Sequence, residues 1–307
     1  MSTVLLEDLS DEQVEAFVRD GFLIVEQGLL SPAALRALRE RFAALFAGDY
    51  ATGIRPDEVN WVAGRDPEDR TRQLCNGWRA DDAVAAQVLS ERLGRLAARL
   101  AGWRGVRLLQ DNVLWKPPGT KALGMHQDAA FAGYLVPAEM ITCWVALDDT
   151  HAGAGTIEYV RGSHRRPKAP PNRGDFHAPE DWLAPMREAA PEGVEPELAP
   201  IEVKAGGCAF HHGRTFHGSG PNTATVERRA LVSHLVPSWT RFHPTEVDVT
   251  YSRHRRRGDL ALDESFFPVT WDADGAHALA RRAAGAGLKT PHSGLTPMSS
   301  AISSHFQ

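Results

Sequence analysis

A histidine and an aspartate stand two positions apart in the stretch GMHQDAAF, residues 124–131. On a β-strand successive side chains alternate between the two faces, so His126 and Asp128 would lie on one face and Gln127 on the other. An imidazole and a carboxylate on one face are suited to holding a divalent metal ion. The pair therefore predicts a metal site that a second segment of the chain must complete.

A second group of histidines lies in the stretch GGCAFHHGRTFHGSGPN, residues 206–222, and offers His211, His212 and His217 as a third ligand. Two histidines and one carboxylate form the facial triad of non-haem Fe(II) oxygenases, which leaves three positions of an octahedral ion open. A zinc hydrolase would usually present another spacing, such as H-E-x-x-H on a helix. The chain has 13 histidines and 39 acidic residues, so the pair alone is weak evidence, and its place in a β-rich region strengthens it.

Two arginines, Arg228 and Arg229, follow shortly after the third histidine of that stretch. An iron enzyme that uses 2-oxoglutarate needs a cation deep in its pocket to hold the distal carboxylate. A guanidinium group suits this task because its fork matches a carboxylate bidentately. The two arginines are therefore candidates for a co-substrate site.

Helices are predicted in the first third of the chain. Ser10 and Gln13 form a capping-box pattern, Ser31 and Pro32 begin a helical stripe over residues 31–48, and a third helix is predicted across residues 81–102. From residue 103 the pattern changes to short strands, at 106–115, 140–149, 156–160, 201–212 and 229–236, after an early strand at 22–27. Alternation within 140–149 is typical of an antiparallel sheet. The sequence thus predicts a mainly β fold with flanking helices and a double-stranded β-helix, the cupin-like jelly roll, at its core.

We expect residues 1–307 to form a single domain with three parts. Residues 1–102 are a helix-rich buttress, residues 103–240 the jelly-roll core, and residues 241–307 a C-terminal extension and tail. A Pro-rich insertion at about 165–200 interrupts the strands, and such long connections are usually functional covers. We predict a lid there, with specificity residing around Asp175 to Trp182.

The composition is that of an ordinary globular protein, with 43% hydrophobic and 24% charged residues. A net charge of −5 gives no basic excess that would favour nucleic acid or a membrane as a partner. Three cysteines without a C-x-x-C spacing argue against a disulfide framework or a thiolate zinc site. The N-terminus is acidic where a signal peptide would be basic, so we expect a cytoplasmic protein. The oligomeric state stays open.

Four segments carry a resemblance to a known family. They are LSDEQVEAFVRDGFLIVEQGLLSP, QDNVLWKPPGTKALGMHQD, CWVALDDTHAGAGTIEYVRGSH and FHGSGPNTATVERRAL. In their order and spacing they resemble the phytanoyl-CoA dioxygenase (PhyH-like) family of Fe(II)/2-oxoglutarate-dependent oxygenases. The resemblance runs from the N-terminus to about residue 235 and does not extend past His243.

The resemblance implies a role for individual residues. His126, Asp128 and His217 would be the iron ligands and the catalytic centre. Arg228, eleven positions after His217, would bind 2-oxoglutarate. The resemblance further implies co-substrate contacts from three residues, Ser219, Trp144 and Asn112. A retained carboxylate at position 128 implies hydroxylation or a related oxidation rather than halogenation.

The implied reaction uses 2-oxoglutarate and dioxygen as co-substrates of Fe(II), releases succinate and CO2, and oxidises a C–H bond of a small molecule. Abundant Ala and Arg are typical of a GC-rich bacterial genome and favour a substrate in secondary metabolism. Phe131, Tyr134 and Trp239 are aromatic candidates for the substrate pocket, and Lys116 is either a pocket contact or a solvated lysine. No role is predicted for His151, His164, His177, His234, His243 or His254.

Two other classes of protein remain as alternatives. One is a metal-dependent cupin-type enzyme that does not use 2-oxoglutarate, and the other is a non-catalytic protein that retains the scaffold. Arg228 and Ser219 speak against the first. A complete set of ligands speaks against the second, because a degenerate homologue would usually have lost one.

Overall fold

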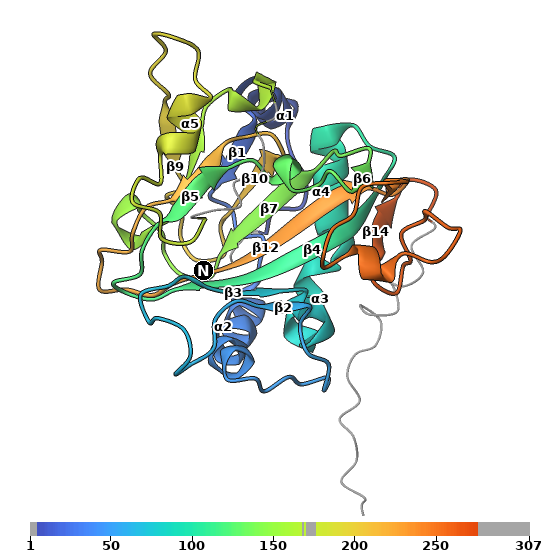
Figure 1. The fold of residues 1–307 in the computed structure, drawn as a ribbon, viewed down its shortest axis with the longest axis horizontal. Coiled ribbons are helices and arrows are strands. Elements are labelled where there is room, and N and C mark those ends of the chain that lie inside the picture. The colour runs from blue at the N-terminus through green and yellow to red at the C-terminus, as the bar shows by residue number, and fades with distance from the viewer. Residues whose placement is uncertain (1–4, 168, 170–175, 276–307) are drawn as a thin grey trace, which may run out of the picture.

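The computed structural model describes residues 5–167, 169 and 176–275, and within them the strands form two main antiparallel sheets (Figure 1). The larger sheet has the order β1-β10-β7-β12-β4-β3-β2, with β14 also paired to β4, and the smaller has the order β5-β11-β8-β9. The strands of the larger sheet are β1 Phe22–Val25, β2 Glu58–Val59, β3 Arg72–Cys75, β4 Gly105–Lys116, β7 Ile141–Ala146, β10 Cys208–His212, β12 Arg228–Pro237 and β14 Val269–Asp272. Those of the smaller sheet are β5 Leu123–His126, β8 Ile157–Val160, β9 Leu198–Pro200 and β11 His217–Ser219, and a further pair consists of β6 Leu135–Val136 and β13 Arg241–Phe242.

The helices of the described residues are α1 Asp11–Asp20, α2 Pro32–Phe46, α3 Asp82–Val88, α4 Glu91–Ala101 and α5 Ala184–Glu188. The first two confirm the predicted caps: Ser10 and Gln13 form a reciprocal capping box, and the Ser31 hydroxyl accepts a hydrogen bond from the Ala34 amide at 3.2 Å. The single third helix that was predicted over 81–102 is wrong. Ser90, the residue before α4, has extended backbone and forms no side-chain capping bond, so the helix is interrupted between α3 and α4.

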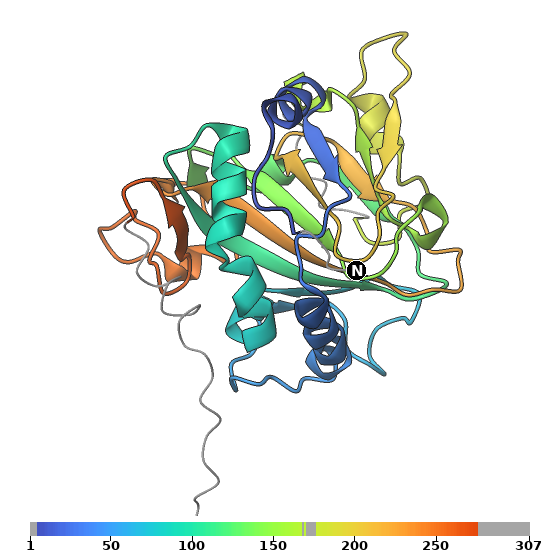
Figure 2. The same ribbon diagram turned by 180° about the vertical axis from the view of Figure 1, so that it is seen from behind.

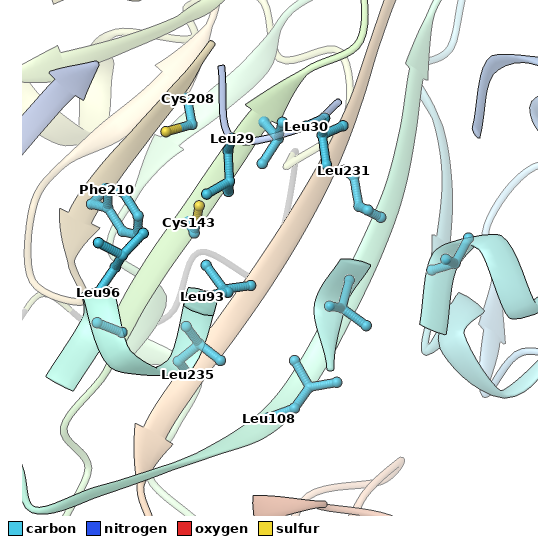
Figure 3. Packing of buried hydrophobic residues seen from close by; sticks show 14 of the residues in the cluster. Leu29, Leu30, Leu93, Leu96, Leu108, Cys143, Cys208, Phe210, Leu231 and Leu235 are labelled. Carbon is cyan, nitrogen blue, oxygen red and sulfur yellow. The ribbon is translucent and has the colours of Figure 1, made fainter. Parts of the chain in front are cut away.

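The larger sheet has two buried faces. Its outer face packs against α2, α3 and α4, which lie across the back of the sheet in Figure 2. Figure 3 shows this layer from close by, with Leu93 and Leu96 of α4 over Cys143, Phe210 and Leu235 of the strands. Its inner face belongs to a separate apolar cluster with residues of the smaller sheet, including Ile157 and Tyr159.

Strand β7 confirms the predicted alternation. Ile141, Cys143 and Val145 belong to the outer cluster that packs on the helices, whereas Trp144 and Ala146 belong to the inner cluster. Every residue of the strand is buried, because helices cover one face and the smaller sheet covers the other. The inner face of β7 and of its neighbours is thus the surface that can carry a site.

Most predicted strands are present, with one correction. Residues 201–212 do not form one strand: β9 ends at Pro200 and β10 begins at Cys208. Gly206 between them has a φ of 95°, a left-handed conformation that favours a turn rather than a strand. This turn returns the chain to the larger sheet, where β10 lies between β1 and β7 and pairs with both.

The described part of the C-terminal extension is folded against the core. Strand β14 pairs with β4, and Tyr251, Leu262 and Phe267 join Tyr134 and Val236 in an apolar cluster. Among the described residues, no helix is both long and apolar enough to cross a membrane.

Candidate metal centre and active site

Three predicted ligands converge where the smaller sheet faces the larger one. His126 ends β5 and His217 begins β11, and the two residues are directly opposite each other in the antiparallel pair. The prediction that Asp128 shares the strand with His126 is wrong, because β5 ends at His126 and Asp128 begins the 3-10 turn Asp128–Ala130. That turn is tied to a neighbouring loop by the Ala129 amide, which donates to the Gly213 carbonyl at 2.8 Å. The turn nevertheless directs the carboxylate to the histidines.

The geometry of these side chains fits a metal ion. The Nε2 atoms of His126 and His217 each lie 3.5 Å from the Oδ1 atom of Asp128, and the candidate ligand atoms of all three residues lie within 4.8 Å of one another. The Nδ1 atoms bond the carbonyl oxygens of Gly124 at 2.9 Å and Thr215 at 3.0 Å. These bonds place the ring proton on Nδ1 and leave the Nε2 lone pairs free for a metal.

The protonation of the cluster suits ligation. Burial, with the nearby His126 and His211, lowers the pKa of His217 well below its ordinary value, so its Nε2 is unprotonated at neutral pH. Burial alone would raise the pKa of Asp128, but His217, His234 and hydrogen bonds hold that pKa well below its ordinary value. The carboxylate is therefore ionised, as a ligand must be.

The second oxygen of the aspartate is held by the larger sheet. Asp128 Oδ2 accepts a hydrogen bond from the Thr142 hydroxyl at 2.6 Å and from His211 Nε2 at 2.9 Å. The Tyr159 hydroxyl lies 3.0 Å from His211 Nδ1, so it donates to that nitrogen and fixes the tautomer of the ring. His211, which was a candidate third ligand, thus bonds the carboxylate instead, while His212 lies on the other side of its strand and forms no contact with the cluster.

His234 extends the same network, although the sequence interpretation gave it no role. Its Nδ1 lies 3.0 Å from the Thr142 hydroxyl and its Nε2 lies 3.0 Å from the Asn112 amide nitrogen. Asn112 in turn accepts from the Gln110 side chain at 2.6 Å. The signal for His234 was present in the sequence, because it lies six residues after Arg228 on one strand and therefore on the same face.

Removal of the Thr142 hydroxyl should loosen the aspartate. In Thr142→Val the side chain keeps its shape but Asp128 Oδ2 loses its shortest hydrogen bond. We expect the affinity for Fe(II) to fall by about tenfold, since contacts that orient a ligand are typically worth 10–100-fold in metal binding. Competition with a chromogenic chelator without oxygen measures this. Thr240→Val is the control, because the Thr240 hydroxyl is buried without a hydrogen-bond partner. Equal Fe(II) affinities of the two variants would contradict the role of Thr142.

A cationic end lies next to the metal cluster. Ser219 stands two residues after His217 on β11, and its hydroxyl accepts a hydrogen bond from Lys116 Nζ at 2.8 Å. Lys116 is directly opposite Arg228 in the pairing of β4 with β12. Within the described residues neither Arg228 nor Lys116 has a salt bridge to a carboxylate, and the Nη1 atom of Arg228 has no partner. Burial and the charge of Arg228 hold the pKa of Lys116 well below its ordinary value, so the positive charge of this end belongs to Arg228. An unpaired buried cation is costly, so this end of the site fits an anionic ligand.

The environment of Arg228 keeps its charge. Burial lowers the pKa of its guanidinium group to about 10, which still leaves it protonated at neutral pH. Its Nε donates to the Gly155 carbonyl at 3.1 Å, and its Cζ lies 5.9 Å from the ring of Trp144. Trp144 itself does not line the cavity but lies beneath Arg228, as part of the inner apolar cluster. Arg229 is on the other face of β12 and pairs with Asp148 at 2.8 Å.

One cavity of about 450 Å³ joins the metal cluster and the cationic end. The residues that line it include His126, Asp128, His217, Ser219 and Arg228, together with Asn112 and His234. Of the predicted pocket aromatics, Phe131 and Tyr134 line the cavity. The prediction for Trp239 is wrong, because its side chain is 50% exposed and lies outside the cavity.

The described part of the predicted lid covers β5. The Phe176 carbonyl accepts from the Gly124 amide at 3.0 Å and the Trp182 carbonyl accepts from the Met125 amide at 2.8 Å. The Phe176 ring stands edge-on to His126 with centroids 4.8 Å apart, and His177 beside it also lines the cavity. Residues 168 and 170–175, with Asp175 among them, lie outside the described residues.

Gln127 follows the end of β5, between the two ligands in the chain, and does not line the cavity. Its amide nitrogen donates to the Arg214 carbonyl at 2.7 Å, and its oxygen accepts from the Ala169 amide at 2.8 Å. Gln127 is fully buried and ties the end of β5 to two loops. It therefore holds the backbone on which both His126 and Asp128 depend.

Comparison with known proteins agrees with this geometry. Residues 17–230 match the profile of the family described as Phytanoyl-CoA dioxygenase (PhyH), which is more than half of the chain. The chain belongs to the phytanoyl-CoA dioxygenase family. Its predicted class is thereby confirmed: it is a non-haem enzyme that depends on iron and 2-oxoglutarate.

Individual relatives are also named as dioxygenases or as enzymes that depend on alpha-ketoglutarate. The chain is 32% identical over 152 residues to a probable alpha-ketoglutarate-dependent hypophosphite dioxygenase of Stutzerimonas stutzeri, a match that spans 49% of this chain and only about half, 52%, of that relative. It is 24% identical over 277 residues to phytanoyl-CoA dioxygenase domain-containing protein 1 of Danio rerio, covering 76% and 92% of the two chains. Among solved structures, the non-heme alpha ketoglutarate dependent carbocyclase SnoK from nogalamycin biosynthesis has a TM-score of 0.67 at 25% identity, over 88% of this chain and 99% of that one.

Proposed function

We propose that this protein is a dioxygenase that hydroxylates, or otherwise oxidises, an unactivated C–H bond of a small molecule, with release of succinate and CO2 from 2-oxoglutarate. His126, Asp128 and His217 would hold the iron. The observation that carries the proposal is that one cavity contains both this cluster and Arg228, a buried cation with an unpartnered nitrogen. We propose that the substrate belongs to bacterial secondary metabolism.

The residues around the cavity would have different roles in binding the co-substrate. Arg228 would bind the distal carboxylate of 2-oxoglutarate, with the Ser219 hydroxyl beside it and Trp144 beneath the guanidinium group. Lys116 lies behind Ser219 and would position its hydroxyl. Asn112 would act through His234, which it bonds, rather than by direct contact with the co-substrate. Bound iron with 2-oxoglutarate and dioxygen supplies the oxidising power, and the chain supplies the binding site and the exclusion of water.

The architecture supports this assignment. We infer that the two facing sheets form the predicted double-stranded β-helix, with the ligands inside it and the helices outside. We likewise propose that residues 1–307 act as one oxygenase domain, because the cavity is lined by residues from β2 to the segment after β13. No single described part of the chain encloses the cavity.

Conversion of 2-oxoglutarate tests the reaction without knowledge of the substrate. Purified protein with Fe(II), ascorbate and 2-oxoglutarate in air should form succinate slowly, because such enzymes turn over their co-substrate at a low rate without the main substrate. Succinate is quantified by proton NMR against samples without Fe(II) or without oxygen. Absence of iron-dependent succinate from protein that binds Fe(II) would contradict the proposed function and favour a metal enzyme that does not use 2-oxoglutarate.

A further inference from the structure

The cavity has an acidic end that the proposed reaction does not use. Two carboxylate residues, Glu58 of β2 and Asp248 of the segment after β13, line it. Arg228 is the one arginine or lysine among the described lining residues, and the proposed function commits it to 2-oxoglutarate. The remaining volume, where a substrate would lie, therefore has negative charge without a compensating cation.

The fold holds the two carboxylates together. In the larger sheet Glu58 is directly opposite Cys75, which is directly opposite Asn112, so all three side chains share the inner face. The Thr250 hydroxyl donates to Glu58 Oε1 at 2.7 Å, while the Thr250 amide donates to Asp248 Oδ1 at 2.8 Å. Within the described part of the chain neither carboxylate forms a salt bridge, although many of its acidic residues elsewhere do.

Two tyrosine side chains complete this end of the cavity. Tyr251 is 5% exposed and lines the cavity, and its buried hydroxyl has no hydrogen-bond partner among the described residues. Its ring stacks on Tyr134 with centroids 5.9 Å apart. Burial, with the charges of Asp248 and Glu58, raises the pKa of the Tyr134 hydroxyl, which places that ring in the field of both carboxylates. Aromatic faces and carboxylates both attract cations.

Near the metal cluster the cavity walls are apolar and favour an uncharged part of the substrate. The Phe131 and Phe176 rings stand edge-on to His126, with centroids 6.2 and 4.8 Å away, and both line the cavity, so they would contact an apolar body. A substrate with a carboxylate or phosphate would bring its charge toward Glu58 and Asp248 and find no described cation except Arg228. The cavity therefore combines an apolar wall at the reacting end with a negative, partly solvated opening.

We propose that the substrate is an amine, with an aliphatic or alicyclic body beside His126 and His217 and a protonated nitrogen at Glu58, Asp248 and the Tyr251 hydroxyl. This inference rests on the proposed function for the placement of the reacting carbon. The charge preference itself depends only on the acidic end of the cavity. Glu58 and Asp248 would then be the carboxylates that determine specificity for an amine.

Three probes of equal length and different charge test the proposal: n-hexylamine, n-hexanol and hexanoate. At neutral pH the amine is protonated, as a lysine side chain is. Binding is measured by calorimetry without oxygen and at low salt. The amine and the alcohol are compared on the apoprotein and on protein loaded with Fe(II) and 2-oxoglutarate. Hexanoate is compared on the loaded protein alone, because Arg228 is available to a carboxylate in the apoprotein. We expect the amine to bind about tenfold more tightly than the alcohol and hexanoate to bind most weakly, with a preference that shrinks as salt is added.

Matched variants locate the preference. Glu58→Gln/Asp248→Asn should bind amine and alcohol with similar affinity, whereas Glu246→Gln, which removes an acidic charge two residues from Asp248 and outside the cavity, should retain the full preference. Retention of the preference in the double variant, or tighter binding of hexanol or hexanoate by wild type, would overturn the proposal. Loading is followed by the visible band of iron-bound 2-oxoglutarate. Amine preference without that band would contradict the proposed function alone, and the band without amine preference would contradict this inference alone.

Discussion

Asp128→Ala should lose Fe(II) binding and with it all formation of succinate. The substitution removes the carboxylate whose Oδ1 lies 3.5 Å from the Nε2 atoms of both His126 and His217. Loss of a ligand should cost more than the roughly 10–100-fold in metal affinity that loss of a supporting contact costs. Fe(II) affinity is measured by chelator competition, and circular dichroism checks that the variant is folded.

A matched control separates the loss of a ligand from the loss of a buried carboxylate. Asp111 is also fully buried, but on the outer side of β4, where it accepts hydrogen bonds at 3.0 Å from the amides of Gly77 and Trp78. Asp111→Asn should lower stability and leave Fe(II) affinity unchanged. Wild-type Fe(II) affinity in Asp128→Ala would show that the metal lies elsewhere, for example at His211 and His234.

Arg228→Gln should weaken the binding of 2-oxoglutarate by roughly 30-fold, which corresponds to about 2 kcal/mol for a lost charge-assisted pair. The guanidinium group is fully buried and its Nη1 atom has no partner within the described residues, so a carboxylate of the co-substrate would be its counter-charge. Because the charge is uncompensated in the apoprotein, its removal should not lower the thermal stability of that form. Titration of the iron-loaded variants with 2-oxoglutarate measures the affinity, and thermal denaturation measures the stability.

Arg229→Gln provides the comparison one position along the chain. Arg229 points to the other face of β12 and already pairs with Asp148, so its loss should leave 2-oxoglutarate binding unchanged and should lower stability instead. The reverse pattern, with unchanged affinity in Arg228→Gln, would assign the co-substrate contact to another residue such as Lys116.

Residues with a local signal could be predicted from the sequence. The caps at Ser10 and Ser31, the alternation along β7 and the shared face of Arg228 and His234 all follow from the periods of helices and strands. The motif left His211, His212 and His217 open as the third ligand, and the family resemblance selected His217, which the fold brings together with His126 and Asp128.

Contacts that depend on the register between distant strands could not be predicted in this way. The bonds of Thr142, His211 and Tyr159 join three strands whose order and alignment arise only from the packed sheets. Asp248 and Tyr251 could not be predicted as cavity residues either. The segment that contains them follows the last segment of the family resemblance, so no motif marks them. Trp239 shows the converse, since residue type alone could not reveal that this aromatic side chain is half exposed.

The most direct test of the account is an anaerobic titration of the apoprotein with Fe(II) and then with 2-oxoglutarate. We predict a visible charge-transfer band of the iron-chelated keto acid in wild type and no band in His217→Ala. His212→Ala should retain the band, because His212 is outside the cluster of ligands. A wild-type protein that binds Fe(II) but develops no band with 2-oxoglutarate, or a band that persists in His217→Ala, would contradict the central claim that this triad and Arg228 form one co-substrate site.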